Sequence, residues 1–124
     1  MINVKELNKI VDKPYKYGKL DCLQLLRIAY GDKLPKSYKG VSLYNYTEKF
    51  DNPQEASKLL VEAIVDYCEQ VKHPRFGDII IVDKVDLIGL YAGNNHMLTA
   101  FIDKGIKVIP IIFPVTYWRL VYNG

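Results

Sequence analysis

Apolar residues follow two different periods along the chain, a helical period in the first half and a strand-like period in the second. A short helix is expected after Asn3, whose side chain can cap it, and the stretch 12–14 should end it. A second helix is expected to begin after Asp21 as its N-cap and to end at Gly31. Cys22 then lies in the first turn of this helix, at the edge of its apolar stripe.

A third helix is predicted after Asn52, because an asparagine followed by Pro53 and Glu55 is a strong helix start. Its apolar face continues to Cys68, which we expect to be buried on that helix. The stretch 32–50 has no sustained period and is expected to be a loop with at most one short helical turn. Its tyrosines could form an aromatic contact surface or pack within the loop and core.

The second half of the chain predicts a sheet. Short β-branched and aromatic runs, separated by turn residues, favour strands at 78–82, 87–91, 96–101, 107–112 and 118–122. Short connections favour antiparallel pairing of successive strands in a meander, and Pro110 places the fourth strand at an edge or on a bulge. We therefore expect an α+β fold of two layers, with N-terminal helices packed on a C-terminal antiparallel sheet.

Composition and charge narrow the possible functions. The 124 residues fit one domain spanning 1–124, and 17 basic against 14 acidic residues give a net charge of +3 without a basic run. Nucleic acid is therefore not an expected partner. No apolar stretch reaches the length of a membrane span, and the start lacks the pattern of a signal peptide, so a cytoplasmic site of synthesis and assembly is expected. No metal or cofactor motif is present.

The chain has two cysteines, Cys22 and Cys68, and their separation fits no metal motif. A thiol at a helix N-terminus lies near unpaired N–H groups and the positive end of the helix dipole, which favour the thiolate. Cys22 is therefore the candidate nucleophile, and a small packing residue is the alternative.

Several short motifs, taken together and in order, resemble the NlpC/P60 family of papain-like cysteine peptidases. They are Pro14-Tyr15-Lys16-Tyr17-Gly18, Asp21-Cys22, Arg75-Phe76-Gly77-Asp78-Ile79-Ile80-Ile81, Ile88-Gly89-Leu90-Tyr91-Ala92-Gly93 and Met97-Leu98. The resemblance implies a papain-like fold, with Cys22 at the nucleophile position and Tyr15 near the oxyanion. A long spacer with Leu34-Pro35 after the cysteine helix is similar to family members encoded beside bacteriophage tail genes.

The resemblance also places two of the family's catalytic residues at positions where this chain has other amino acids. The family histidine falls at Leu87 and the third catalytic residue at Thr99, and leucine cannot transfer a proton. His96 is three positions from Thr99, so strand alternation directs it to the opposite face. His73 is expected to be a surface residue, and Asp86 is a weak base toward a thiol.

The expected function follows from these departures. The resemblance implies a catalytically degenerate structural component of a phage tail tip or baseplate, located in the virion and bound to other tail proteins. An active cysteine endopeptidase that cleaves peptidoglycan peptide stems, with a base from His96 or another chain, is the alternative. A non-catalytic module that binds peptide or cell wall is the third hypothesis.

Overall fold

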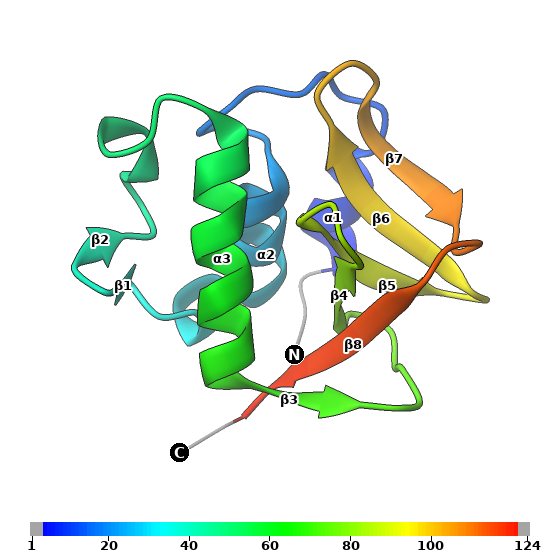
Figure 1. The fold of residues 1–124 in the computed structure, drawn as a ribbon. Coiled ribbons are helices and arrows are strands. Elements are labelled where there is room, and N and C mark those ends of the chain that lie inside the picture. Colours follow the sequence, from blue (N-terminus) through cyan, green and yellow to red (C-terminus); the bar gives the residue numbers. More distant parts are fainter. Residues whose placement is uncertain (1–3, 122–124) are drawn as a thin grey trace.

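The computed structural model describes residues 4–121 and has mixed α+β architecture (Figure 1). Its α-helices are α1 (Val4–Ile10), α2 (Cys22–Tyr30) and α3 (Pro53–Tyr67), with short 3-10 turns at Gly31–Lys33 and Tyr46–Glu48. Its strands are β1 (Ser37–Tyr38), β2 (Val41–Ser42), β3 (Cys68–Val71), β4 (Ile79–Val82), β5 (Leu87–Gly93), β6 (His96–Phe101), β7 (Gly105–Pro110) and β8 (Val115–Leu120). The predicted α+β class is confirmed.

Two predicted helix starts are confirmed by their caps. The Asp21 side chain accepts a hydrogen bond from the backbone N–H of Gln24, and the Asn52 side chain accepts one from the N–H of Glu55. Both caps satisfy donors that have no partner within their own helix. The proposed cap of the first helix, Asn3, lies outside the described residues.

Six strands form one antiparallel sheet in the order β3-β8-β4-β5-β6-β7. Strands β4 to β7 form the predicted meander, and β7 with Pro110 lies at an edge as expected. The last strand differs from the prediction: β8 does not follow β7 in the sheet but returns to lie between β3 and β4. The segment after β7 therefore crosses from one edge of the sheet back toward the other.

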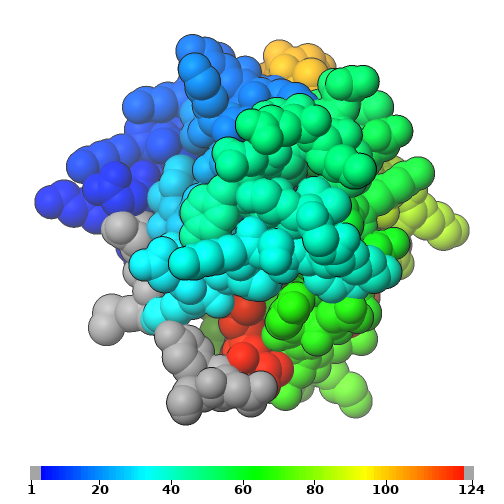
Figure 2. Space-filling model, turned by 90° about the vertical axis from the view of Figure 1, so that its left-hand side faces the viewer, coloured from blue at the N-terminus to red at the C-terminus, as the bar shows by residue number. Residues whose placement is uncertain are grey.

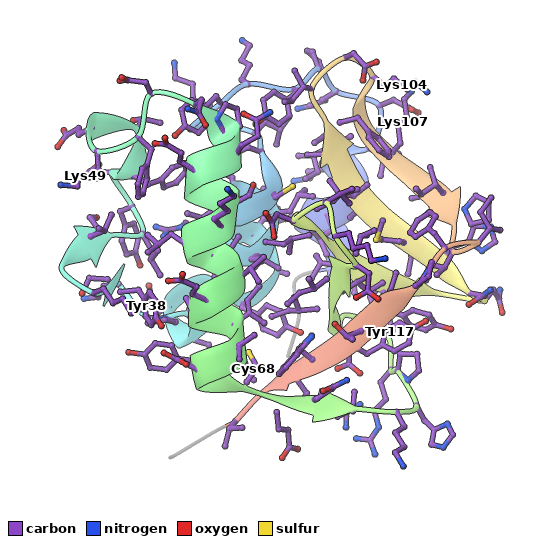
Figure 3. The ribbon with its side chains drawn as sticks, in the orientation of Figure 1. Tyr38, Lys49, Cys68, Lys104, Lys107 and Tyr117 are labelled. Carbon is purple, nitrogen blue, oxygen red and sulfur yellow. The ribbon has the colours of Figure 1, made fainter. Side chains whose placement is uncertain are left out.

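The prediction that Cys68 lies on the third helix was wrong. The helix ends at Tyr67, and Cys68 opens β3, where it pairs with Leu120 of β8 at the lower end of α3 (Figure 3). The expected loop at 32–50 also contains the small hairpin β1–β2 and one 3-10 turn. Figure 2 shows this segment spread over one face of the molecule beside α3.

The sheet has an apolar cluster on each face. Ile79 and Ile81 of β4 pack with the helices in the larger cluster, whereas Ile80 and Val82 belong to a second cluster with Met97 and Ile111. Strand alternation explains the division, because successive side chains point to opposite faces. The larger cluster fixes α2 against β5 and β6, and this contact positions the N-terminus of α2 beside the sheet.

Candidate functional site

The N-terminal end of α2 faces an open groove with a volume of about 500 Å³. One wall is the first half of α3, and the other consists of the β4–β5 and β6–β7 turns. The lining residues are Tyr15, Cys22, Pro53, Gln54, Ser57, Lys58, Lys84, Val85, Asp86, Leu87, Ala100, Phe101, Ile102 and Asp103. The groove therefore brings together three residues that the sequence singled out, Tyr15, Cys22 and Leu87, from separate parts of the chain.

Cys22 is the first residue of α2, as predicted, but its side chain is only partly exposed and contacts β6. The Sγ atom lies 3.9 Å from the carbonyl oxygen of Ala100, to which it can donate. Burial raises the pKa of the Cys22 thiol, and the negative charge of Asp21 raises it further. Hydrogen bonding to Ile88, Ala100 and Thr99 acts in the opposite direction but does not reverse the shift. Cys22 therefore remains a thiol where an activated nucleophile would be a thiolate.

Asp21 is buried and fully occupied by hydrogen bonds. Besides capping α2, its carboxylate accepts a hydrogen bond of 2.6 Å from the N–H of Gly18 and another from the hydroxyl of Tyr46. Gln24 completes the network by donating to the carbonyl of Gly18 and to the Tyr46 hydroxyl. These contacts join the loop before α2 to the segment before α3. Asp21 therefore has a structural role as a helix cap and as the centre of this network.

Tyr15 lines the groove together with Cys22. Burial raises the pKa of Tyr15, and the negative charge of Asp21 adds to the shift. Its hydroxyl therefore stays protonated at neutral pH and can donate a hydrogen bond to a bound acceptor. This capacity serves binding as well as catalysis.

The positions assigned to the missing catalytic residues differ in their surroundings. Leu87 opens β5, lines the groove and packs against the second apolar cluster. Thr99 is fully buried and donates a 2.8 Å hydrogen bond to the carbonyl of Ile88, so its hydroxyl is occupied within the sheet. Neither side chain can accept a proton from Cys22.

Both histidines lie outside the groove lining. His96 opens β6, and its Nδ1 lies 2.7 Å from the carbonyl oxygen of Asn94. The β6–β7 register is uninterrupted from His96 to Phe101, so His96 is four strand positions, or about 13 Å, from Ala100. His73 is exposed between β3 and β4. The structure therefore brings no imidazole of this chain to Cys22.

Four charged side chains line the groove. Lys58 belongs to α3, Lys84 and Asp86 to the β4–β5 turn, and Asp103 to the β6–β7 turn. Within residues 4–121 none of the four forms an ion pair. Charges of both signs are thus available to a ligand, beside the apolar Val85 and Ile102. This arrangement suits binding of a polypeptide surface.

Sequence reasoning missed much of this environment. Tyr46 is 1% exposed although it lies in a segment without periodicity: its ring packs in the larger apolar cluster and its hydroxyl donates to Asp21. The α3 wall was also missed, because the apolar face of that helix identifies the residues that pack inward and not those that line a groove. No short local signal marks either feature.

Two features are absent from residues 4–121, a metal-binding group and a membrane-spanning helix. No group of three or more His, Cys, Asp or Glu side chains is placed to hold a metal ion. No helix is long and apolar enough to cross a membrane. In comparisons with known proteins, the chain matches no family model, no curated protein and no solved structure.

Proposed function

We propose that this chain is a structural subunit of a bacteriophage tail tip or baseplate, with an NlpC/P60-like, papain-like fold that has lost catalysis. Its role is to bind neighbouring tail proteins. Support for the fold comes from the order of the motifs along the chain and from the place of Tyr15 and Cys22 together in one groove at the start of α2. Leu87 borders the same groove, and its side chain packs against the second apolar cluster. Support for the tail assignment comes from the sequence resemblance.

One observation carries the loss of catalysis: the Cys22 thiol is partly buried against β6, its pKa is raised, and neither histidine of the chain lines the groove around it. Papain-like chemistry requires a thiolate to attack the amide and an imidazole to accept and return the proton. Loss of one member of such a unit lowers the rate by orders of magnitude. A groove that retains Tyr15 and unpaired charges can still bind.

The turnover test uses purified peptidoglycan and the full chain. We expect no release of soluble peptides above the level given by a Cys22→Ala variant, as measured by mass spectrometry of the supernatant. Release by the native chain that disappears in Cys22→Ala would establish the endopeptidase instead. A sedimentation assay on the same material separates wall binding from turnover, because a wall-binding module would sediment with peptidoglycan without cleaving it.

The assembly role is tested separately on particles. Gold-labelled antibodies against the chain should decorate the tail end of purified virions of a phage that encodes it. A chain found in the lysate but absent from purified virions would contradict the structural assignment. Since this result does not depend on the cysteine, the two parts of the proposal can fail independently.

A further inference from the structure

The connection between β7 and β8 presents one apolar side chain to solvent from a constrained backbone. We call residues 110–114 the Ile112 knob. Ile111 is buried, its N–H donates to the carbonyl of Asn95, and its own carbonyl accepts from the Asn95 side chain. Pro110 and Pro114 restrict the backbone on both sides. Ile112 is nevertheless 84% exposed, more than any other large hydrophobic residue in 4–121.

A second apolar feature is a cavity between α1 and the sheet, which we call the α1 cavity. It has a volume of about 220 Å³ and is lined by Val4, Leu7, Phe76, Leu90 and Val108 among others. Val4, Phe76 and Val108 remain substantially exposed at this site. No charged side chain contributes to the described lining. Because a dry cavity of about 150 Å³ is enough to hold benzene, the α1 cavity has room for a branched aliphatic side chain.

We propose that copies of this chain associate by inserting the Ile112 knob of one copy into the α1 cavity of another. The α1 cavity has room for an isoleucine side chain, and neither feature is charged, since no charged residue occurs from Val108 to Trp118 and none is in the described cavity lining. An uncharged projection entering an uncharged cavity leaves no buried charge without a partner. A second copy supplies both features at once, and Ile112 does not fill the cavity of its own chain because it is exposed.

Pairing of β7 edges is a weaker route to the same association. The outward N–H of Ile106 already donates to the carbonyl of Lys13, and the carbonyl of Ile106 accepts from the N–H of Asp12. Along β7, Pro110 is the second residue after Ile106 whose backbone faces the free edge, and it has no N–H to donate. In Figure 1 the β7–β8 connection lies on the side of the sheet turned away from α3, where α2 and α3 leave it free. The contact is therefore made by side chains and not by strand addition.

The contact joins different surfaces of the two copies. Such a contact forms a ring if the rotation between copies closes and a chain of copies if it does not. In either case each copy donates one knob and accepts one. Variants that remove only the knob or only the cavity should therefore complement each other.

Sedimentation velocity of the full chain across micromolar to sub-millimolar concentrations tests the proposal. The wild type should form species larger than a monomer, and Ile112→Asp should weaken association by about tenfold or more, because an aspartate would be buried without a partner. Val108→Asp should have the same effect through the α1 cavity. Val65→Asp is the matched control: Val65 is 48% exposed on α3, belongs neither to the Ile112 knob nor to the α1 cavity lining, and should leave association unchanged when replaced.

Mixing the variants gives the decisive measurement. Ile112→Asp keeps an intact cavity and Val108→Asp keeps an intact knob, so an equimolar mixture should form a complex that neither variant forms alone. Circular dichroism melts of each variant would show that folding is retained. A wild type that stays monomeric at the highest concentration, or a mixture that stays monomeric while both variants are folded, would overturn the proposal.

Discussion

Two buried carboxylates differ in the charge of the groups that surround them. Asp21 precedes α2 and Asp78 precedes β4, and each is only 4% exposed. Asp78 is paired with a guanidinium: Arg119 donates to it from Nε at 2.9 Å and from Nη2 at 2.7 Å. The backbone N–H of Arg75 adds a third bond of 2.8 Å. The negative charge of Asp78 is thus compensated.

Asp21, by contrast, is held by uncharged donors alone, two backbone N–H groups and the Tyr46 hydroxyl. The negative charge of Asp21 is therefore not neutralised by a hydrogen-bonded cation, and it acts on neighbouring side chains. The Asp21 charge is the second largest cause, behind burial, of the raised pKa of Tyr15 and of Tyr17. It also raises the pKa of Cys22. The comparison teaches that a cysteine at a helix N-terminus is not activated where it is partly buried beside a carboxylate that no cation pairs with.

Removing the Asp21 carboxylate should have the largest effect on stability. Asp21→Ala deletes the cap of α2 and leaves the buried Tyr46 hydroxyl without its acceptor, so the free energy of unfolding should fall by about 3 kcal/mol in urea titrations. Tyr46→Phe removes only one partner of the same carboxylate and should cost about 1 kcal/mol. Equal losses in the two variants would show that the cap contributes nothing beyond the Tyr46 contact.

The Asp78 site should be less sensitive. Asp78→Ala breaks a largely buried ion pair, but the Arg119 side chain is 30% exposed and can regain water, so a loss of about 2 kcal/mol is expected. Arg119→Met combined with Asp78→Ala should cost less than the sum of the single variants, because neither charge is then left unpaired. Strict additivity in the double-mutant cycle would mean that the two groups do not stabilise each other.

Local chemistry explains which parts of the fold could be predicted from the sequence. The caps Asp21 and Asn52 act within three residues along the chain, and β4 to β7 are joined by short turns, so these features were anticipated. The position of Cys22 in the first turn of α2 followed from the same local signal. Residues that line the groove could be predicted only where such a local signal marks them.

Features that depend on distant residues were missed. The place of β8 between β3 and β4 is set by packing across the sheet, and the sequence near Val115 does not encode its neighbours. Strand β3 has no alternation, since Glu69 and Gln70 are both exposed, and Cys68 continued the helical pattern. Tyr46 is buried by contacts with distant residues: its ring packs against Tyr17, and a carboxylate 25 positions away accepts its hydrogen bond.

The smallest expected effect tests the comparison most directly. Asp21→Asn keeps a good N-cap for α2 but removes the charge beside Cys22. The raised pKa of the native Cys22 thiol means that the thiolate forms only above the usual pH, so the alkylation rate should still be rising with pH where a free thiol has already reached its plateau. Without the Asp21 charge, this profile should move to lower pH.

Iodoacetamide labelling followed by mass spectrometry of the Cys22 peptide measures that shift. At a fixed pH below the thiol pKa, we expect labelling to be faster in Asp21→Asn than in the native chain, since a lower pKa raises the thiolate fraction, although burial, the larger cause of the raised pKa, remains. Asp78→Asn is the matched control and should leave the Cys22 rate unchanged, because its carboxylate does not contribute to the pKa of Cys22. If Cys22 is labelled at the native rate in both variants, burial alone keeps the thiol protonated. The charge of Asp21 then has no effect on the reactivity of Cys22.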